Sequence, residues 1–253
     1  MSTPLKPLRW YRELGERQGR LAAGAFLVEG ERAIRQVAGL HPESVTEIIS
    51  VTEPPSAYHR YPRRLVTESQ FRYICHTRTP QGIMAVVRAP ADISTDTLPA
   101  AIGRKALLLE DIQDPGNVGT LIRTAAAFDF SGVVLTESCA DPLSPKCVQA
   151  TAGTVLSVWL RRTSKYLELA GELKDAGFTL VAADLAGGDG PSVLEGRSKV
   201  LLALGSEGAG LSEKLLSLAD YRLYLPTARE KAESLNVAAC GAILMYLVSQ
   251  AQQ

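Results

Sequence analysis

The second half of the chain alternates between two hydrophobic periods. Short apolar runs, typical of buried strands, are separated by longer stretches in which apolar residues recur every three or four positions, as in amphipathic helices. The predicted strands are 106–109, 132–135, 155–160, 179–185, 199–204 and 221–225, and the predicted helices are 118–128, 145–152, 166–176, 212–219 and 235–250. This alternation indicates an α/β fold with a mostly parallel sheet covered on both faces.

The first ninety residues show shorter elements with proline- and glycine-rich breaks between them. Helices are predicted at 8–20, 31–38 and 68–75, and strands at 25–29, 45–51, 64–66 and 83–87. The next residues, 89–103, contain two prolines and little periodicity, which is typical of a linker. We therefore expect a small α/β domain over residues 1–90, a linker over 91–103 and a larger domain over 104–253.

Charge is distributed unevenly between these parts. The whole chain has 27 basic and 27 acidic side chains, but residues 1–90 have 13 Lys and Arg against 8 Asp and Glu. A basic front part is a modest indication of a nucleic-acid partner. Arginines scattered over an ordinary surface explain the charge equally well.

Other patterns exclude several classes of protein. The four cysteines form no CxxC pair and the three histidines have no HExxH spacing, so we expect neither a disulfide framework nor a metal site. The first residues show no apolar, small-residue pattern of a secretory signal, so we expect no secretory leader. The longest apolar run, 237–248, is interrupted by Gly241 and is shorter than the ~18 residues of a membrane span. We expect a soluble cytoplasmic protein that does not bind membranes.

Three polar loops follow predicted strands, where ligands bind in open α/β sheets. The first, 114–119, contains Asn117 and precedes Arg123; the second, 205–211, has three glycines around Glu207; the third joins Leu225 and Pro226 to the segment 233–238. Each also has a purely structural explanation, namely a capped helix start for the first and third and a flexible connection for the second. Together, however, the three loops can converge on one pocket.

Read in order, the three loops resemble the motifs of the SpoU/TrmH family of SPOUT methyltransferases. The first motif is Asn-x-Gly-x-x-x-Arg, and the second is Gly-x-Glu-Gly-x-Gly. The third is a proline followed by Ser-Leu-Asn-Val-Ala. The matching residues are Asn117, Gly119, Arg123, Gly205, Glu207, Gly208, Gly210, Pro226, Ser234, Leu235, Asn236, Val237 and Ala238. The segment 141–153 is also similar, so the resemblance extends from about residue 106 to the C-terminus.

This resemblance implies a methyltransferase domain with a deep trefoil knot, which transfers a methyl group from S-adenosylmethionine to a ribose 2′-hydroxyl of RNA. It also implies a homodimer formed through the C-terminal domain, and it requires no metal. The implied cofactor-binding residues are Gly205, Glu207, Gly208, Leu225, Pro226, Ser234, Leu235, Asn236 and Val237. The implied catalytic residues are Asn117, Arg123, Glu207, Ser234 and Asn236.

Arg123 has the central role in this scheme. Because a guanidinium holds its proton firmly, we expect Arg123 to grip the phosphate beside the target ribose rather than to act as a base. That phosphate or a water would then accept the proton of the hydroxyl.

The front part resembles the ribosomal-protein-like RNA-binding domain of the same family, through the segments 26–30 and 79–83. Candidate phosphate contacts are Arg9, Arg12, Arg17, Arg20 and Lys146, although a solvated helix face explains the first four equally well. This domain favours ribosomal RNA over transfer RNA as the substrate. A non-catalytic RNA-binding or ribosome-assembly factor on the same fold is the alternative, against which the complete set of motif residues argues.

Overall fold

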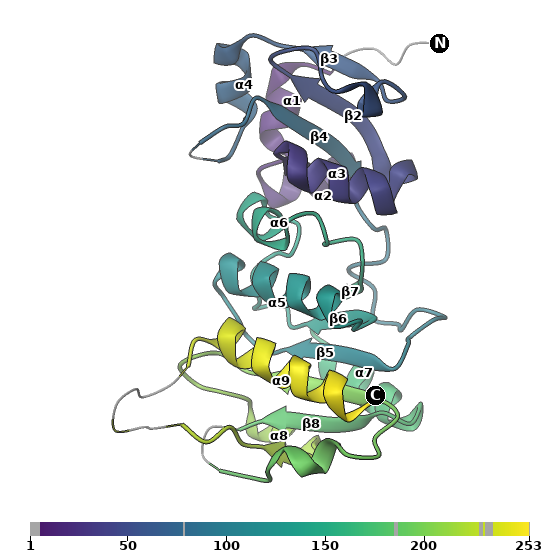
Figure 1. The fold of residues 1–253 in the computed structure, drawn as a ribbon, viewed down its shortest axis with the longest axis vertical. Helices are drawn as coiled ribbons and strands as arrows, with labels where there is room; N and C mark the ends of the chain where they lie inside the picture. Colours follow the sequence, from purple (N-terminus) through teal and green to yellow (C-terminus); the bar gives the residue numbers. More distant parts are fainter. Residues whose placement is uncertain (1–5, 78, 185–186, 228–229, 231–234, 253) are drawn as a thin grey trace. The chain divides into compact units, whose positions relative to one another are not determined.

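The computed structural model describes residues 6–77, 79–184, 187–227, 230 and 235–252. Contacts divide the chain into two compact units. The first unit comprises the chain up to Ala91 together with Asp141–Leu156, and the second comprises Asp92–Ala140 and the chain from Ser157 onward. Figure 1 labels helices and strands of both units.

The first unit is built on a four-stranded sheet with the order β1-β4-β2-β3. Its strands are β1 (Ala25–Glu29), β2 (Val45–Ser50), β3 (Arg63–Leu65) and β4 (Ile83–Arg88). Strand β4 pairs antiparallel with β1 and β2, while β3 runs parallel to β2. All four strands lie within a residue or two of their predicted positions, and the apolar residues of β1 and β4 are buried on both faces.

Five α-helices of the described chain belong to the first unit: α1 (Leu8–Glu13), α2 (Arg17–Ala23), α3 (Glu31–Leu40), α4 (Glu68–Ile74) and α6 (Pro145–Thr151). Short 3₁₀ helices cover Pro42–Ser44 and Ser56–Tyr58. The prediction of one helix over residues 8–20 was wrong. Glu16 is extended, and the turn before it packs so closely that a Cβ on Gly15 would lie 2.0 Å from the His76 ring.

The second unit contains a six-stranded sheet with the order β10-β8-β9-β5-β6-β7, in which every neighbouring pair is parallel. Its strands are β5 (Lys105–Leu109), β6 (Gly132–Leu135), β7 (Trp159–Arg162), β8 (Thr179–Ala183), β9 (Val200–Leu204) and β10 (Tyr221–Leu223). The mostly parallel α/β sheet is therefore confirmed. Strand β7 begins four residues later than predicted, because the chain through Leu156 packs with the first unit instead.

Helices cover both faces of this sheet (Figure 1). They are α5 (Pro115–Ala127), α7 (Tyr166–Asp175), α8 (Glu213–Leu218) and α9 (Val237–Ala251), with a 3₁₀ helix at Pro191–Leu194. Helices α5 and α9 lie together on one face, and α7 and α8 lie on the other (Figure 1). Leu169, Leu173 and Leu215 of α7 and α8 share one core cluster with alternate residues of the strands, as the period of two in a strand requires.

The compact units differ from the predicted boundaries in two places. The segment 92–103, expected to be a linker, is bound to the second unit: Asp92 pairs with Arg161 at 2.7 Å, and Asp96 with Lys165 at 3.0 Å. The segment 141–156, expected within the larger domain, packs on the first unit. There, a Cβ on Gly153 would lie 2.5 Å from the Ala33 carbonyl oxygen.

Strand order and register do not by themselves define how the chain threads through its loops, so the trefoil knot stays a prediction. No helix of the described chain is long and apolar enough to cross a membrane.

Candidate active site

The first motif loop becomes the start of helix α5. The Asp114 carboxylate caps this helix by accepting a hydrogen bond from the Asn117 backbone N–H at 3.0 Å, and Pro115 occupies the first turn. The helix therefore begins three residues earlier than predicted, and Asn117 lies within its first turn. Val118 and Gly119 are buried against the sheet, so Asn117 is held at the carboxyl end of β5 with its side chain half-buried.

The glycine loop folds back on itself after β9. The Gly210 N–H donates to the Ser206 carbonyl at 2.9 Å, and Gly210 has a φ of +69°. A Cβ on Gly205 would lie 2.1 Å from the Gly210 carbonyl carbon, so the close approach of the two ends requires a glycine there. A Cβ on Gly208 would have no neighbour within 4 Å in the described chain. A side chain at Gly208 would therefore meet no described protein atom.

The third motif leads into helix α9. The Asn236 side-chain oxygen accepts hydrogen bonds from the N–H groups of Ala238 at 3.0 Å and Ala239 at 3.2 Å, which is an N-cap. Asn236 is therefore fixed at the start of a buried helix. Ser234, assigned above to both the catalytic and the cofactor-binding group, lies outside the described residues.

A chain of side-chain hydrogen bonds joins the three loops. The Asn236 amide donates to the Asn117 side-chain oxygen at 3.1 Å. The Asn117 amide in turn donates to a carboxylate oxygen of Glu207. Asn117 is thus joined in one polar row to residues that lie 90 and 119 positions away in sequence. The structure brings these three predicted catalytic residues together, one from each motif.

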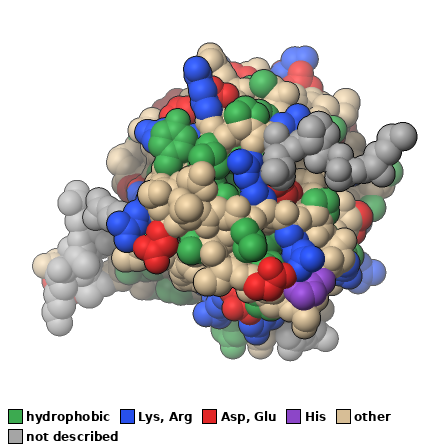
Figure 2. Space-filling view, turned by 90° about the horizontal axis from the view of Figure 1, so that it is seen from above, with side chains coloured by type: hydrophobic (Ala, Val, Ile, Leu, Met, Phe, Trp, Pro, Cys, Tyr) green, Lys and Arg blue, Asp and Glu red, His purple; other side chains and the backbone are tan. Residues whose placement is uncertain are grey.

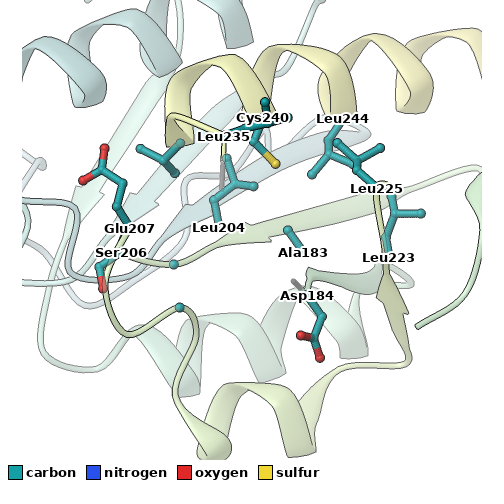
Figure 3. A pocket seen from close by; sticks show the side chains of 13 residues that line it. Ala183, Asp184, Leu204, Ser206, Glu207, Leu223, Leu225, Leu235, Cys240 and Leu244 are labelled. Atoms are coloured by element: carbon teal, nitrogen blue, oxygen red, sulfur yellow. The ribbon is translucent and has the colours of Figure 1, made fainter. Parts of the chain in front are cut away.

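Beside this row lies an apolar pocket at the carboxyl ends of β8, β9 and β10 (Figure 3). Its walls come from strand ends, the glycine loop and one side of α9. The lining residues are Ala183, Asp184, Leu204, Gly205, Ser206, Glu207, Gly210, Leu223, Leu225, Leu235, Val237, Cys240 and Leu244. Of the predicted cofactor-binding residues, this lining includes Gly205, Glu207, Leu225, Leu235 and Val237, and it lacks Gly208, Pro226 and Asn236.

The model of the SpoU rRNA Methylase family matches residues 104–246, which is more than half of the chain. This chain belongs to the SpoU rRNA methylase family. The resemblance stated from the three motifs is therefore confirmed. A second model, the MRM3-like substrate binding domain, matches residues 7–85.

Full-length relatives of this SpoU family member are known. A Bacillus subtilis protein named 23S rRNA (guanosine(2553)-2'-O)-methyltransferase RlmP is 33% identical over 241 residues and covers 93% of each chain. The structure of the SpoU methyltransferase AviRb from Streptomyces viridochromogenes, in complex with AdoMet, matches with a TM-score of 0.82, 26% identity and 98% of both chains. A TrmH-family protein from Porphyromonas gingivalis matches with a TM-score of 0.81, 30% identity and the same coverage. These matches confirm the α/β fold with its small N-terminal domain.

Sequence analysis missed several pocket residues of this SpoU family member. Ala183 ends β8 and Leu223 ends the neighbouring strand β10, and the signal that could have found them is that position at the carboxyl edge of the sheet. Cys240 and Leu244 follow Val237 at helical spacing, which places all three on one side of α9. Burial raises the pKa of the Cys240 thiol, so this side chain is a neutral, apolar part of the wall.

Glu110 is a further residue that the sequence analysis missed. Its carboxylate is only 4% exposed and accepts hydrogen bonds from the Tyr166 hydroxyl at 2.7 Å, the Ser212 N–H at 2.6 Å and the Ser212 hydroxyl at 2.7 Å. Glu110 directly follows β5, and Ser212 directly follows the glycine loop. The buried carboxylate therefore holds the exit of that loop to the strand that leads to Asn117.

Arg123 is exposed on α5 and makes no hydrogen bond or ion pair with any residue that the structure describes. It lies six residues after Asn117, which corresponds to about 240° around a helix. The two side chains therefore leave the helix in different directions. The polar row does not include Arg123.

The candidate phosphate contacts divide into two groups. Arg9, Arg12, Arg17 and Lys146 are exposed. Arg20 was wrongly included, because it is 5% exposed and its guanidinium pairs with Asp141 at 2.5 Å while donating to the Leu14 and Gly15 carbonyls. Its charge is therefore used within the first unit, where it binds α2 to the segment that precedes α6.

Proposed function

We propose that this protein is an S-adenosylmethionine-dependent methyltransferase that modifies a ribose 2′-hydroxyl, with ribosomal RNA as its substrate. The observation that carries this proposal is the hydrogen-bonded row Asn236–Asn117–Glu207 at the rim of an apolar pocket. Membership of the SpoU family and a full-length relative named as a 23S rRNA 2'-O-methyltransferase support the reaction.

The chemistry of the pocket lining suits S-adenosylmethionine. Leu204, Leu235 and Leu244 offer apolar surface to an adenine ring, and the glycine loop allows its backbone to approach the ligand closely. Glu207 places a carboxylate at the same rim, where it can attract the cationic part of the cofactor. When bound, S-adenosylmethionine supplies an electrophilic methyl group on a sulfonium.

The side chains of the polar row would align the attacking ribose. Asn117 is held from two sides, by Asn236 and by Glu207, so its amide keeps one orientation. Such fixed alignment lowers the entropic part of the barrier to methyl transfer. Because the row holds a carboxylate and two amides, it can orient the hydroxyl by hydrogen bonds as the hydroxyl attacks.

Arg123 would bind the phosphate next to the target ribose. Its guanidinium is exposed and has no ion-pair partner among the described residues, and a guanidinium can bind a phosphate through two parallel hydrogen bonds. That phosphate or a water accepts the proton of the hydroxyl, while Arg123 stabilises the charge that develops. We further propose a homodimer through the second unit, with the RNA held by the first unit, in the cytoplasm where ribosomal RNA is assembled.

The decisive experiment is methyl transfer from radiolabelled S-adenosylmethionine to ribosomal RNA isolated from cells that lack this gene. A methylated 2′-oxygen cannot attack the neighbouring phosphate, so the labelled linkage should resist alkaline hydrolysis. Label in an alkali-sensitive position would contradict ribose methylation. If calorimetry shows cofactor binding but no methyl group reaches ribosomal or transfer RNA, the result would favour the non-catalytic alternative. If only transfer RNA is methylated, transfer RNA and not ribosomal RNA is the substrate.

A further inference from the structure

A second hollow lies in the first unit, between helix α1 and the C-terminal end of α4. It has a volume of about 510 Å³, within the roughly 300–1,000 Å³ of small-molecule sites. Its lining includes Arg9, Arg12, Arg72, Tyr73 and His76. Neither the three motifs nor the proposed reaction uses this hollow.

Tyr73 supplies an aromatic surface to the hollow. The residue is 43% exposed, which is unusual for a large ring. The Arg12 guanidinium lies 4.7 Å from the ring centroid and also donates to the Tyr73 carbonyl at 3.3 Å. The ring is thus held by a cation on one side and remains accessible to a ligand.

Two more arginines at the hollow, Arg9 and Arg72, are in weak ion pairs that an anionic ligand can replace. Arg9 pairs with Glu13 at 2.7 Å and Arg72 pairs with Glu68 at 3.8 Å, both on exposed helix surface. Exposed pairs of this kind contribute only about 0–1 kcal/mol, so a phosphate can replace the carboxylate. The lining of the hollow contains three arginines and two carboxylates, Glu13 and Glu16.

His76 forms a fixed wall of the hollow. Its ring packs directly on the backbone of Gly15, where any Cβ would lie 2.0 Å from the ring. Its backbone N–H donates to Glu29 at 2.8 Å, which anchors the residue from the other side. A rigid imidazole at this place can form a hydrogen bond with the edge of a base.

We propose that this hollow binds one unpaired nucleotide of the RNA substrate, with its base stacked on Tyr73 and its phosphate held by Arg9 or Arg72. The inference rests on the proposed function for the presence of an RNA. Aromatic rings and arginine planes recognise unstacked bases of single-stranded RNA, whereas duplex bases are inaccessible to them. On the face seen in Figure 2, Lys and Arg side chains lie among acidic, hydrophobic and other side chains and form no continuous basic surface.

The test measures binding of the full-length protein to a fluorescent single-stranded oligoribonucleotide and to a blunt duplex of the same sequence. The wild type should prefer the single strand. Tyr73→Ala should weaken single-strand binding by roughly five- to a hundredfold, the equivalent of the ~1–3 kcal/mol of one stacked base. Tyr73→Phe keeps the ring and should bind within about twofold of the wild type.

Arg35→Ala is the matched control, because Arg35 also sits in an exposed i,i+4 pair, with Glu31 at 2.5 Å, in the same unit. It should lose less affinity than Arg9→Ala or Arg72→Ala. Unchanged binding in Tyr73→Ala, equal losses in Tyr73→Phe, or equal affinity for strand and duplex would each overturn the proposal. Because the assay contains no cofactor, loss of methyl transfer alone would count against the proposed function and not against this site.

Discussion

Asn236 donates a hydrogen bond to the side-chain oxygen of Asn117 at 3.1 Å, although 119 positions separate the two residues. Each is also part of a helix start, Asn236 as the cap of α9 and Asn117 in the first turn of α5. The bond therefore ties two helix N-termini to one place on the sheet. The Asn117 amide also donates a hydrogen bond to Glu207, so the glycine loop is joined to the same two helix starts.

Asn117→Ala should break the row at its centre. We expect methyl transfer to fall on the order of a hundredfold, since an aligned donor acts mainly in the transition state. Cofactor affinity should change by no more than about threefold, because Asn117 is not part of the pocket lining. Single-turnover kinetics and calorimetry measure the two quantities. Thr120→Ala, an exposed change one turn further along α5, is the control, and an equal loss there would count against a specific role.

Arg123→Ala should keep the fold, because the side chain is exposed. Methyl transfer should nevertheless fall by on the order of a hundredfold or more, as for other lost electrostatic contacts in a transition state. Lysine should rescue poorly, because it lacks the planar fork of the guanidinium. An RNA with one 2′-deoxy nucleotide at the target should bind but accept no methyl group. Wild-type rates in Arg123→Ala would remove this residue from the mechanism.

Two glycines of the same loop should respond differently to substitution. Gly208→Val should lower cofactor affinity, because Gly208 belongs to the glycine motif that we assign to the cofactor, and it should leave the melting temperature unchanged, since its Cβ would meet no described protein atom within 4 Å. Gly205→Ala should destabilise the protein by about 1–3 kcal/mol, because its Cβ would collide with the Gly210 backbone. Calorimetry with S-adenosylmethionine and thermal unfolding separate the two effects. Unchanged cofactor affinity in Gly208→Val would remove Gly208 from the site.

Tyr166 should make stability depend on pH in the alkaline range. Burial, together with the hydrogen bond to Glu110, raises its pKa from 10.0 to about 12. The folded state then holds this proton more tightly than the unfolded state, so the stabilisation is complete below pH 10 and is lost as the pH rises to about 12. Tyr166→Phe should reduce this decline. Urea unfolding at a series of pH values measures it, and an identical decline in both proteins would contradict the assignment.

Arg17 and Arg20 lie on one short helix but should differ in their effects. Arg20→Ala removes one partner of a buried ion pair with Asp141 and should lower the free energy of unfolding by about 3 kcal/mol. Arg17→Ala, on the exposed face, should leave stability within about 0.5 kcal/mol and reduce RNA affinity in a salt-dependent way. Denaturant unfolding and RNA titrations at two salt concentrations distinguish them. The reverse pattern would place Arg20, and not Arg17, on the RNA surface.

The sequence by itself determined the alternation of strands and helices, the parallel sheet and the family. Strand and helix periods are local, so β5, β6, β9 and the helices that follow them could be located from apolar spacing alone. The motif residues were identifiable for the same reason, since each motif is a short continuous segment. Asn117, Glu207 and Asn236 were therefore predicted as site residues before any contact between them was known.

Tertiary structure alone decided which of these side chains meet. The row Asn236–Asn117–Glu207, the exclusion of Arg123 from it and the loop anchor at Glu110 depend on how distant strand ends are packed. Arg20 resembled its exposed neighbours in sequence, and only the approach of Asp141, 121 positions away, made it an internal residue. Segment 141–156 likewise belongs to the first unit because its apolar surface is buried there, and burial is a property of the packed chain that no local pattern contains.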